Sequence, residues 1–279
     1  MKADLHTHSY MSDGTLSPRE VVRAAHDADV ELLALTDHDS FAGCLEAADE
    51  GKKLGVTVIS GIEIDTWNGE EEIHMLGLDF DMENAELCEA LRRQMEKRAE
   101  RTAAILKKLR ALGYDVSQSE LSCRGTMTRL TIANLLVKNG FATDRSDAFK
   151  RLIGAGKPAY ADFERIDSEE AIRLINGAGG ISVIAHPCKM HGNPHAAIAK
   201  LANAGLWGVE AFYPSSTQGQ KELFISIAAQ NGLRTTCGSD FHGANRPNVT
   251  IGMSCEPSKL LDKTASEIMR RRERKMLTK

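Results

Sequence analysis

Long hydrophobic runs are missing from this sequence of 279 residues, because no stretch of 18 or more consecutive apolar residues occurs. This absence excludes a transmembrane helix and a membrane partner. The first six residues include no apolar core of an export signal, so we expect a cytoplasmic protein. None of the six cysteines stands in a Cys-x-x-Cys pair, and we expect reduced thiols rather than disulfides or a zinc knuckle.

A strong net charge is also missing, since 35 Lys and Arg residues against 39 Asp and Glu residues give −4. This balance excludes a generic nucleic-acid coat protein. The segment 83–161 nevertheless carries 15 Lys and Arg against 9 Asp and Glu, which is +6, and the rest of the chain is then at −10. Such an asymmetry predicts one surface for an anion. No Gly-x-Ser-x-Gly motif occurs, so acyl-enzyme chemistry lacks support.

Short apolar runs, several of them rich in β-branched residues, alternate with helical patterns. Seven such runs predict strands at 2–5, 31–35, 56–64, 72–78, 181–185, 208–212 and 234–237. Between the first two, Ser17, Pro18 and Glu20 mark a helix start, with Ser as the N-cap and Glu three residues later. The alternation predicts an α/β fold with a largely parallel sheet.

The segment 83–161, called here the helical segment, contains no convincing strand. Apolar residues recur every three or four positions from Leu87 to Leu109, and Gly113 follows as a predicted C-cap. Cations are predicted on the opposite face, namely Arg92, Arg93, Lys97, Arg101 and Lys108. A second helix is predicted over 129–139. We expect this segment to be an insertion that caps a barrel formed by residues 1–82 and 162–279.

Side chains that bind metals lie in, or directly follow, six of the seven predicted strands. They are His6, His8, Asp13, Asp37, His38, Asp39, Glu63, His74, His186, Asp240 and His242. Six of the nine histidines occupy such positions, and the carboxyl ends of barrel strands are where β/α barrels collect catalytic groups. Imidazole and carboxylate without thiolate fit Mn, Zn or Fe(II) better than a structural zinc.

The motifs between residue 2 and about residue 252 resemble, in order, those of the polymerase and histidinol phosphatase (PHP) superfamily. They are His6-Thr7-His8, Thr36-Asp37-His38-Asp39, Gly61-Ile62-Glu63, Ala185-His186-Pro187 and Gly238-Ser239-Asp240-Phe241-His242-Gly243. The helical segment with Thr128-Arg129 resembles the small stand-alone phosphoesterases of the superfamily. Some of these act on nucleoside 3′,5′-bisphosphates or RNA 5′ ends, and others are cyclic phosphate dihydrolases.

This resemblance implies a distorted (β/α)7 barrel, the PHP fold, that holds three divalent metal ions, with Mn favoured and Zn or Fe possible. It implies that Glu63 bridges the first two ions and that Glu63, Asp240 and His242 are catalytic. The first ion would be held by His6, His8, Glu63 and Asp240, the second by Glu63, His74 and His186, and the third by Asp13, His38 and His242. No position that this arrangement requires is missing from the sequence.

Charge balance predicts a phosphate substrate independently. Three divalent ions bring +6, and Asp13, Glu63 and Asp240 return −3. A bridging hydroxide and a phosphate dianion would neutralise the remainder. The expected reaction is hydrolysis of a phosphate ester by attack of a metal-bridging hydroxide on phosphorus, with release of phosphate.

Two cations are candidates for binding the substrate. Arg129 matches a family arginine that faces the site, and its planar fork suits a phosphate. Lys157 lies in the run Gly154-Ala155-Gly156-Lys157-Pro158. Related phosphoesterases often have a histidine two residues after the arginine, whereas this chain has Thr131. That departure weakens the transfer of a nucleotide bisphosphate substrate in particular.

Several alternatives remain open at this point. A nucleoside 3′,5′-bisphosphate and a ribose cyclic phosphate compete as substrates. A 5′–3′ exoribonuclease that trims RNA ends is the main alternative function, although the helical segment has only four aromatic residues for stacking. A non-catalytic metal-bound module is disfavoured because all nine ligands are present. Asp37 and Asp39 are expected to orient ligands or cap loops, and His191 and His195 to be exposed loop residues.

Overall fold

The computed structural model describes residues 1–116 and 125–277. Strands in this part of the chain form two sheets. The three-stranded sheet has the order β1-β2-β3, and the six-stranded sheet has the order β6-β4-β5-β7-β8-β9. Their bounds are β1 Ala3–Thr7, β2 Leu32–Leu35, β3 Thr57–Ile59, β4 Gly61–Trp67, β5 Glu72–Leu78, β6 Ile166–Asp167, β7 Ile181–Ile184, β8 Gly208–Phe212 and β9 Arg234–Cys237. The predicted α/β class is therefore found. Five of the seven strand pairs are parallel, as expected of a largely parallel arrangement, and both antiparallel pairs involve β5.

Two features of the sheets differ from prediction. The apolar run 56–64 is not one strand, because the chain turns at Ser60 and places β3 and β4 in different sheets. Strand β5 is antiparallel to both β4 and β7. A tight turn explains the first antiparallel pair, since Asn68 N–H donates to Glu71 O at 3.2 Å and Gly69 takes a left-handed φ of 99°.

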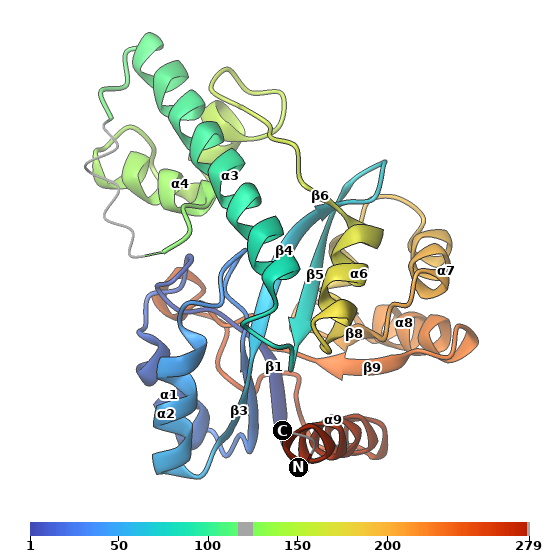
Figure 1. Ribbon diagram of the computed structural model, residues 1–279. Coiled ribbons are helices and arrows are strands. Elements are labelled where there is room, and N and C mark those ends of the chain that lie inside the picture. Colours follow the sequence, from blue (N-terminus) through green and yellow to red (C-terminus); the bar gives the residue numbers. More distant parts are fainter. Residues whose placement is uncertain (117–124, 278–279) are drawn as a thin grey trace.

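Helices pack on the outside of the strands and enclose three apolar clusters (Figure 1). Outside the helical segment they are α1 Pro18–Asp27, α2 Cys44–Leu54, α6 Ser168–Gly177, α7 Pro194–Asn203, α8 Gln218–Gln230 and α9 Lys259–Leu277. The predicted start of α1 is confirmed, because Ser17 and Glu20 form a reciprocal capping box. The start of the chain contacts α9, because the Met1 amino group lies 3.0 Å from Asp262 Oδ1 in the first turn of that helix.

The helical segment has an apolar core of its own. Its helices are α3 Ala85–Ala111, α4 Arg129–Lys138 and α5 Arg145–Ala148. Its described residues contain no strand, as predicted. One cluster of buried side chains draws all its members from between Ile105 and Ala161, so the far half of α3 packs on α4 rather than on a sheet. The near half of α3 places Leu87 and Leu91 in the cluster of the six-stranded sheet.

Helix α3 has a more complicated pattern of burial than its sequence predicts. Ala99, expected on the apolar face, is exposed. Gln94, Arg98 and Arg101 are buried, with exposed fractions of 2%, 3% and 5%. Arg101 therefore does not lie on the solvated basic face where we expected it. The middle of α3 faces polar groups of the strands, and buried polar side chains meet them there.

Isolated bridges join the two sheets where the predicted ligands lie. Thr7 at the end of β1 pairs with Phe241 beyond β9, and His38 beyond β2 pairs with Glu63 in β4. These contacts bring the carboxyl ends of strands from both sheets together. No helix among the described residues is both long and apolar enough to cross a membrane. The five cysteines in this part of the chain are free thiols, whereas Cys123 lies outside the described residues.

Candidate metal centre

All nine predicted metal ligands meet in one buried cluster. Eight of them are less than a tenth exposed, and His74 is the most accessible member, with its side chain 22% exposed. The cluster divides into overlapping groups whose ligand atoms lie within 4.8 Å of one another. The groups are His8, Asp13, His38 and His242; His6, His186 and Asp240; His6, His8 and Glu63; Glu63, His74 and His186; and His38, Asp65 and His74.

Glu63 connects two of these groups through its two carboxylate oxygens. Its Oε2 lies 3.3 Å from His6 Nε2 and 3.2 Å from His8 Nε2. Its Oε1 lies 2.8 Å from His74 Nδ1 and 2.9 Å from His186 Nε2. A carboxylate placed in this way can bridge two cations.

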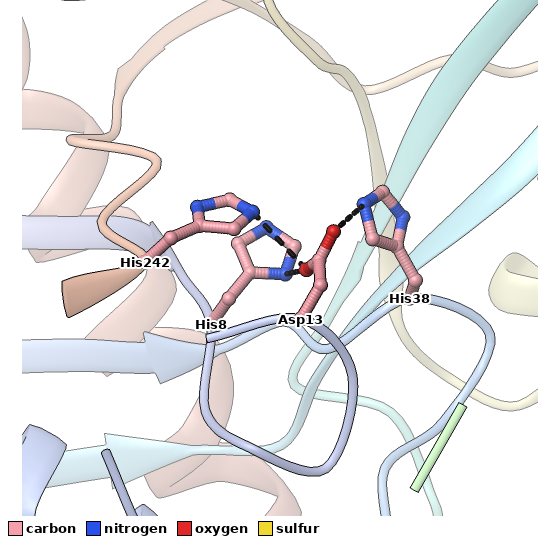
Figure 2. Close-up of side chains that lie close together, drawn as sticks. All are labelled: His8, Asp13, His38 and His242. Atoms are coloured by element: carbon pink, nitrogen blue, oxygen red, sulfur yellow. Dashed lines mark ion pairs between the residues drawn. The ribbon is translucent and has the colours of Figure 1, made fainter. Parts of the chain in front are cut away.

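Asp13 has the corresponding position in a third group, shown in Figure 2. Its Oδ1 lies 3.2 Å from His242 Nε2, and its Oδ2 lies 3.8 Å from His38 Nε2. The rings of His8 and His242 stack with their centroids 4.1 Å apart. The ring nitrogen of His242 that faces Asp13 is buried and has no well-aligned hydrogen bond among the described residues.

The carboxylates of the cluster are held ionised. Burial alone would raise the pKa of Glu63, but the neighbouring His38 and His6 outweigh it and lower that pKa well below its usual value. Burial likewise opposes ionisation of Asp240, and His6 and Lys189 lower its pKa. Ionised carboxylates, clustered imidazoles and an unpartnered ring nitrogen are the donor set that a divalent metal ion binds, so the residues fit such ions.

Glu210 supports the cluster from the sixth predicted strand, where no metal-type residue was assigned. It is fully buried in β8; its Oε1 lies 3.0 Å from His6 Nδ1, and its Oε2 accepts a hydrogen bond from His186 N–H at 2.7 Å. A carboxylate on the far nitrogen fixes the tautomer and orientation of a ligand imidazole. The signal in the sequence was a single charged residue inside an otherwise apolar run.

Asp240 is held on its outer side by three donors that sequence reasoning missed. Its Oδ1 faces the histidines, at 3.3 Å from His8 Nε2. Its Oδ2 accepts from Tyr213 OH at 2.6 Å, from Lys189 Nζ at 3.2 Å, and from Arg246. These residues come from three loops without a common motif. They place two cations beside the centre.

Backbone strain accompanies three of the site residues. Asp39, His186 and Asp240 have φ angles of 51°, 29° and 54°, a left-handed region that side chains other than glycine seldom adopt. Each of them stands just after a strand. The sharp turn redirects the chain so that neighbouring side chains point into the cluster.

The two aspartates around His38 lie outside the groups of candidate metal ligands, and Asp37 holds a loop in place, as expected. Asp37 Oδ1 accepts from Ser9 N–H at 2.8 Å and from Ser12 Oγ at 2.6 Å. It thereby fixes the loop that carries Asp13. Asp39 instead accepts hydrogen bonds from side chains of α3.

Helix α3 reaches the metal centre through Arg98. The Arg98 Nε donates to Asp39 Oδ2 at 2.9 Å, and its Nη2 donates to Asp65 Oδ2 at 2.7 Å. Asp65 Oδ1 lies 3.0 Å from His38 Nδ1. Asp65 was not predicted, although it follows Glu63 at the spacing of two that places residues on one face of a strand.

The predicted substrate-binding cations lie at different places. Arg129 is the first residue of α4, its side chain is 27% exposed, and its Nη2 lies 3.8 Å from Glu72 Oε2. Lys157 is exposed, and its ammonium group has no hydrogen-bond or ion-pair partner in the described part of the chain. His191 and His195 are exposed, as expected.

The PHP domain family matches residues 4–153 of this chain, which is more than half of its length. The chain belongs to the PHP family. This PHP protein is 36% identical over 249 residues to a 5′-3′ exoribonuclease of Haemophilus influenzae, covering 86% of this chain and 90% of that one. It is 32% identical over 256 residues to a 3′,5′-nucleoside bisphosphate phosphatase of Chromobacterium violaceum, covering 89% and 90%.

A third relative has a different substrate. It is the phosphoribosyl 1,2-cyclic phosphate 1,2-diphosphodiesterase of Eggerthella lenta, 31% identical over 250 residues, with 87% of this PHP protein and 95% of the relative covered. Solved structures agree with the family. An amidohydrolase of Chromobacterium violaceum, with bound sulfate and no metal, has a TM-score of 0.89 at 30% identity, with 97% of both chains covered.

A protein of Bifidobacterium adolescentis, for which metal-dependent phosphoesterase activity is inferred, has a TM-score of 0.87 at 28% identity, with 96% of both chains covered. The predicted family and the predicted class of activity, metal-dependent hydrolysis of phosphate esters, are confirmed by these relationships.

Proposed function

We propose that this PHP protein releases inorganic phosphate from a small phosphorylated metabolite, by hydrolysing one ester bond of a nucleoside 3′,5′-bisphosphate or both ester bonds of a ribose cyclic phosphate. The observation that carries the proposal is the position of Glu63, which has three imidazoles on Oε2 and two on Oε1, all at 2.8–3.3 Å. Relatives named for both substrates cover at least 87% of this chain.

The nine clustered ligands would hold three divalent ions, with manganese favoured by their imidazole and carboxylate donors. His6, His8, Glu63 and Asp240 form the first set; Glu63, His74 and His186 form the second; Asp13, His38 and His242 form the third. Bound divalent ions lower the pKa of water and polarise P–O bonds. We further propose that the two sheets together form the predicted distorted barrel, with the helical segment as an insertion that caps it.

The surrounding residues have roles that follow from their contacts. Glu210 orients His6 through its Nδ1. Tyr213, Lys189 and Arg246 neutralise and position the outer oxygen of Asp240. Arg129, partly exposed at the start of α4, would bind the phosphate that is not cleaved, and the exposed Lys157 would assist.

Release of inorganic phosphate by Mn²⁺-loaded protein, and of a mononucleotide where the compound is a dinucleotide, tests the proposal. The panel consists of adenosine 3′,5′-bisphosphate, ribose 1,2-cyclic phosphate 5-phosphate, histidinol phosphate and a 5′-phosphorylated dinucleotide. We expect preference for one of the first two. In Arg129→Ala, KM should rise more for a doubly phosphorylated substrate than for a monophosphate. Arg173→Ala is the matched control, because Arg173 is exposed and forms ion pairs with Glu86 and Glu170 at the surface.

Trimming of RNA 5′ ends is a second candidate. The exoribonuclease relative of Haemophilus influenzae is 36% identical to this chain, and the helical segment has a net charge of +6. Preference for the phosphorylated dinucleotide, with affinity that falls steeply as salt rises, would favour this activity. Absence of phosphate from every compound would refute the proposed substrate class.

A further inference from the structure

Three of the four polar atoms of Asp65, in β4, have a fixed and buried partner. Its backbone N–H donates to Asp39 Oδ1 at 3.1 Å, and its backbone C=O accepts from Gln94 Nε2 at 2.8 Å. Its Oδ2 accepts from Arg98 Nη2 at 2.7 Å. All three partner residues are buried. They hold the carboxylate in one orientation, and they thereby also fix the direction of its other oxygen, Oδ1.

This remaining oxygen of Asp65 faces two of the proposed metal ligands. It lies 3.0 Å from His38 Nδ1 and 3.7 Å from His74 Nε2. Asp65 Oδ1 and His38 Nδ1 are both buried, and neither has a well-aligned hydrogen bond among the described residues. His74 Nε2 has a nearer carboxylate, Glu72 Oε1 at 3.2 Å. The Asp65 oxygen therefore matters most for His38.

The two ring nitrogens of His38 face different carboxylates. Nε2 faces Asp13, with which His38 would hold the third ion, and Nδ1 faces Asp65 (Figure 2 shows the contact with Asp13). Glu63 Oε2 lies 3.3 Å from the same Nδ1, but this oxygen also faces the imidazoles of the first ion's ligand set. A neutral imidazole carries one N–H, so Nε2 can bind a cation only when the hydrogen is on Nδ1.

We propose that Asp65 is a positioning residue, which accepts the Nδ1–H of His38 and thereby presents Nε2 of this imidazole to the third ion. The inference rests on the proposed function. A carboxylate in this relation to a ligand imidazole fixes its tautomer and its ring orientation. Arg98 extends the effect, because it anchors the same carboxylate to α3. The placement of the helical segment and the orientation of a metal ligand thus depend on one side chain.

A cation between the same residues is the alternative, since the ligand atoms of His38, Asp65 and His74 lie within 4.8 Å of one another. The orientation of the two rings favours positioning. His74 Nδ1 faces Glu63 at 2.8 Å, and His38 Nε2 faces Asp13. An ion beside Asp65 would therefore need the second nitrogen of two rings that already face other ion positions. An imidazole binds two cations only after it loses both ring hydrogens, whereas positioning leaves each ring neutral.

Asp65→Asn tests the role through metal binding rather than catalysis. The amide keeps the size of the side chain and can still accept from Arg98, but it no longer offers a charged oxygen to His38. Titration calorimetry with Mn²⁺ should show at least one binding event weakened about tenfold to a hundredfold, with the same number of ions bound at saturation. An unchanged affinity would overturn the proposal. Loss of a whole equivalent at saturation would also overturn it, because Asp65 would then be a ligand.

Glu50→Gln is the matched control. Glu50 is a buried carboxylate that pairs with Arg23 and Lys53, and it belongs to no candidate group of metal ligands in the described part of the chain. Both variants remove one buried carboxylate that is paired with an arginine, so both should lose stability in urea unfolding. Only Asp65→Asn should lose Mn²⁺ affinity. Equal losses of affinity in the two variants would show that a general loss of stability causes the effect.

Nitrogen NMR of the histidine rings reads the orientation of His38 directly. In protein loaded with diamagnetic Zn²⁺, the wild type should show the ring hydrogen of His38 on Nδ1, in slow exchange with water. Glu50→Gln should give the same signal, and Asp65→Asn should exchange this hydrogen faster. A hydrogen on Nε2 in wild type, or equal exchange in wild type and Asp65→Asn, would overturn the proposal. Neither measurement uses a phosphate ester, so a wrong substrate class would leave both results unaffected.

Discussion

Replacing Arg98 with methionine should destabilise the protein strongly, and Arg101→Met provides a comparison one turn along the same helix. Arg98 is 3% exposed and contacts the carboxylates of Asp39 and Asp65 at 2.9 Å and 2.7 Å. Both carboxylates are buried, so the substitution leaves two adjacent anions without their cation. Removing one partner of a buried ion pair costs about 3–5 kcal/mol, and the double loss places the expectation at the upper end.

Arg101→Met removes an equally buried guanidinium. In the part of the chain that the structure describes, this group donates to Ala161 O and has no carboxylate partner. The free energy of unfolding of the Arg101→Met protein should differ from that of wild type by no more than about 1 kcal/mol. Urea unfolding followed by circular dichroism measures both variants, with equal m values as the condition for comparison. A loss of about 4–5 kcal/mol corresponds to a decrease in Tm of roughly 8–20 °C for a chain of this size. Equal losses in the two variants would refute the reasoning.

Two further predictions concern the metal centre. Glu210→Gln should weaken Mn²⁺ binding about tenfold to a hundredfold, because His6 loses the carboxylate on its Nδ1. Calorimetric titration measures the Mn²⁺ affinity. An unaltered affinity would contradict the proposal that Glu210 orients His6. In metal-free protein, burial lowers the pKa of His38, but the carboxylates of Glu63 and Asp65 outweigh burial and raise this pKa from 6.5 to about 9. The stabilisation from this histidine is complete below pH 6.5 and is lost as pH rises through about 9, so Tm should fall across that range. Because Mn²⁺ binds neutral imidazoles, saturating Mn²⁺ should remove this decrease in Tm.

The sequence predicted most of the strands and the first helix because their signals are local, whereas the two-residue strand β6 was missed. The capping box at Ser17 and the apolar runs of the strands need no knowledge of distant residues. The break at Ser60 was not predicted, because the run from Val56 to Ile64 is apolar on both sides of it. Only the pairing of β3 with β2, and of β4 with β5, shows that the run belongs to two sheets.

The residues of the candidate site that belong to sequence motifs could be predicted. Those that the fold brings together from unrelated positions could not. The nine predicted ligands lie in strands or directly after them in a recognisable order, and the structure brings all of these residues together. Glu210 and Asp65 are single acidic residues whose roles depend on which imidazole each one contacts. The sequence does not reveal these contacts. The buried middle of α3 was missed because helical periodicity describes one continuous apolar face. That helix changes from an apolar face to a polar one at Gln94 and back again at Ile105.

The ligand cluster also determines when during synthesis the protein can acquire metal. His6 and His242 are more than 230 positions apart, and Glu63, His186 and Asp240 lie between them. At about 5–20 residues per second, a ribosome needs roughly 10–50 s to add the chain that separates the first histidine from the last. For almost all of that interval a nascent chain presents only fragments of the first and third proposed ligand sets, which are completed by Asp240 and His242. Selection among the cell's metal ions is therefore postponed until the completed fold can impose its own geometry on them.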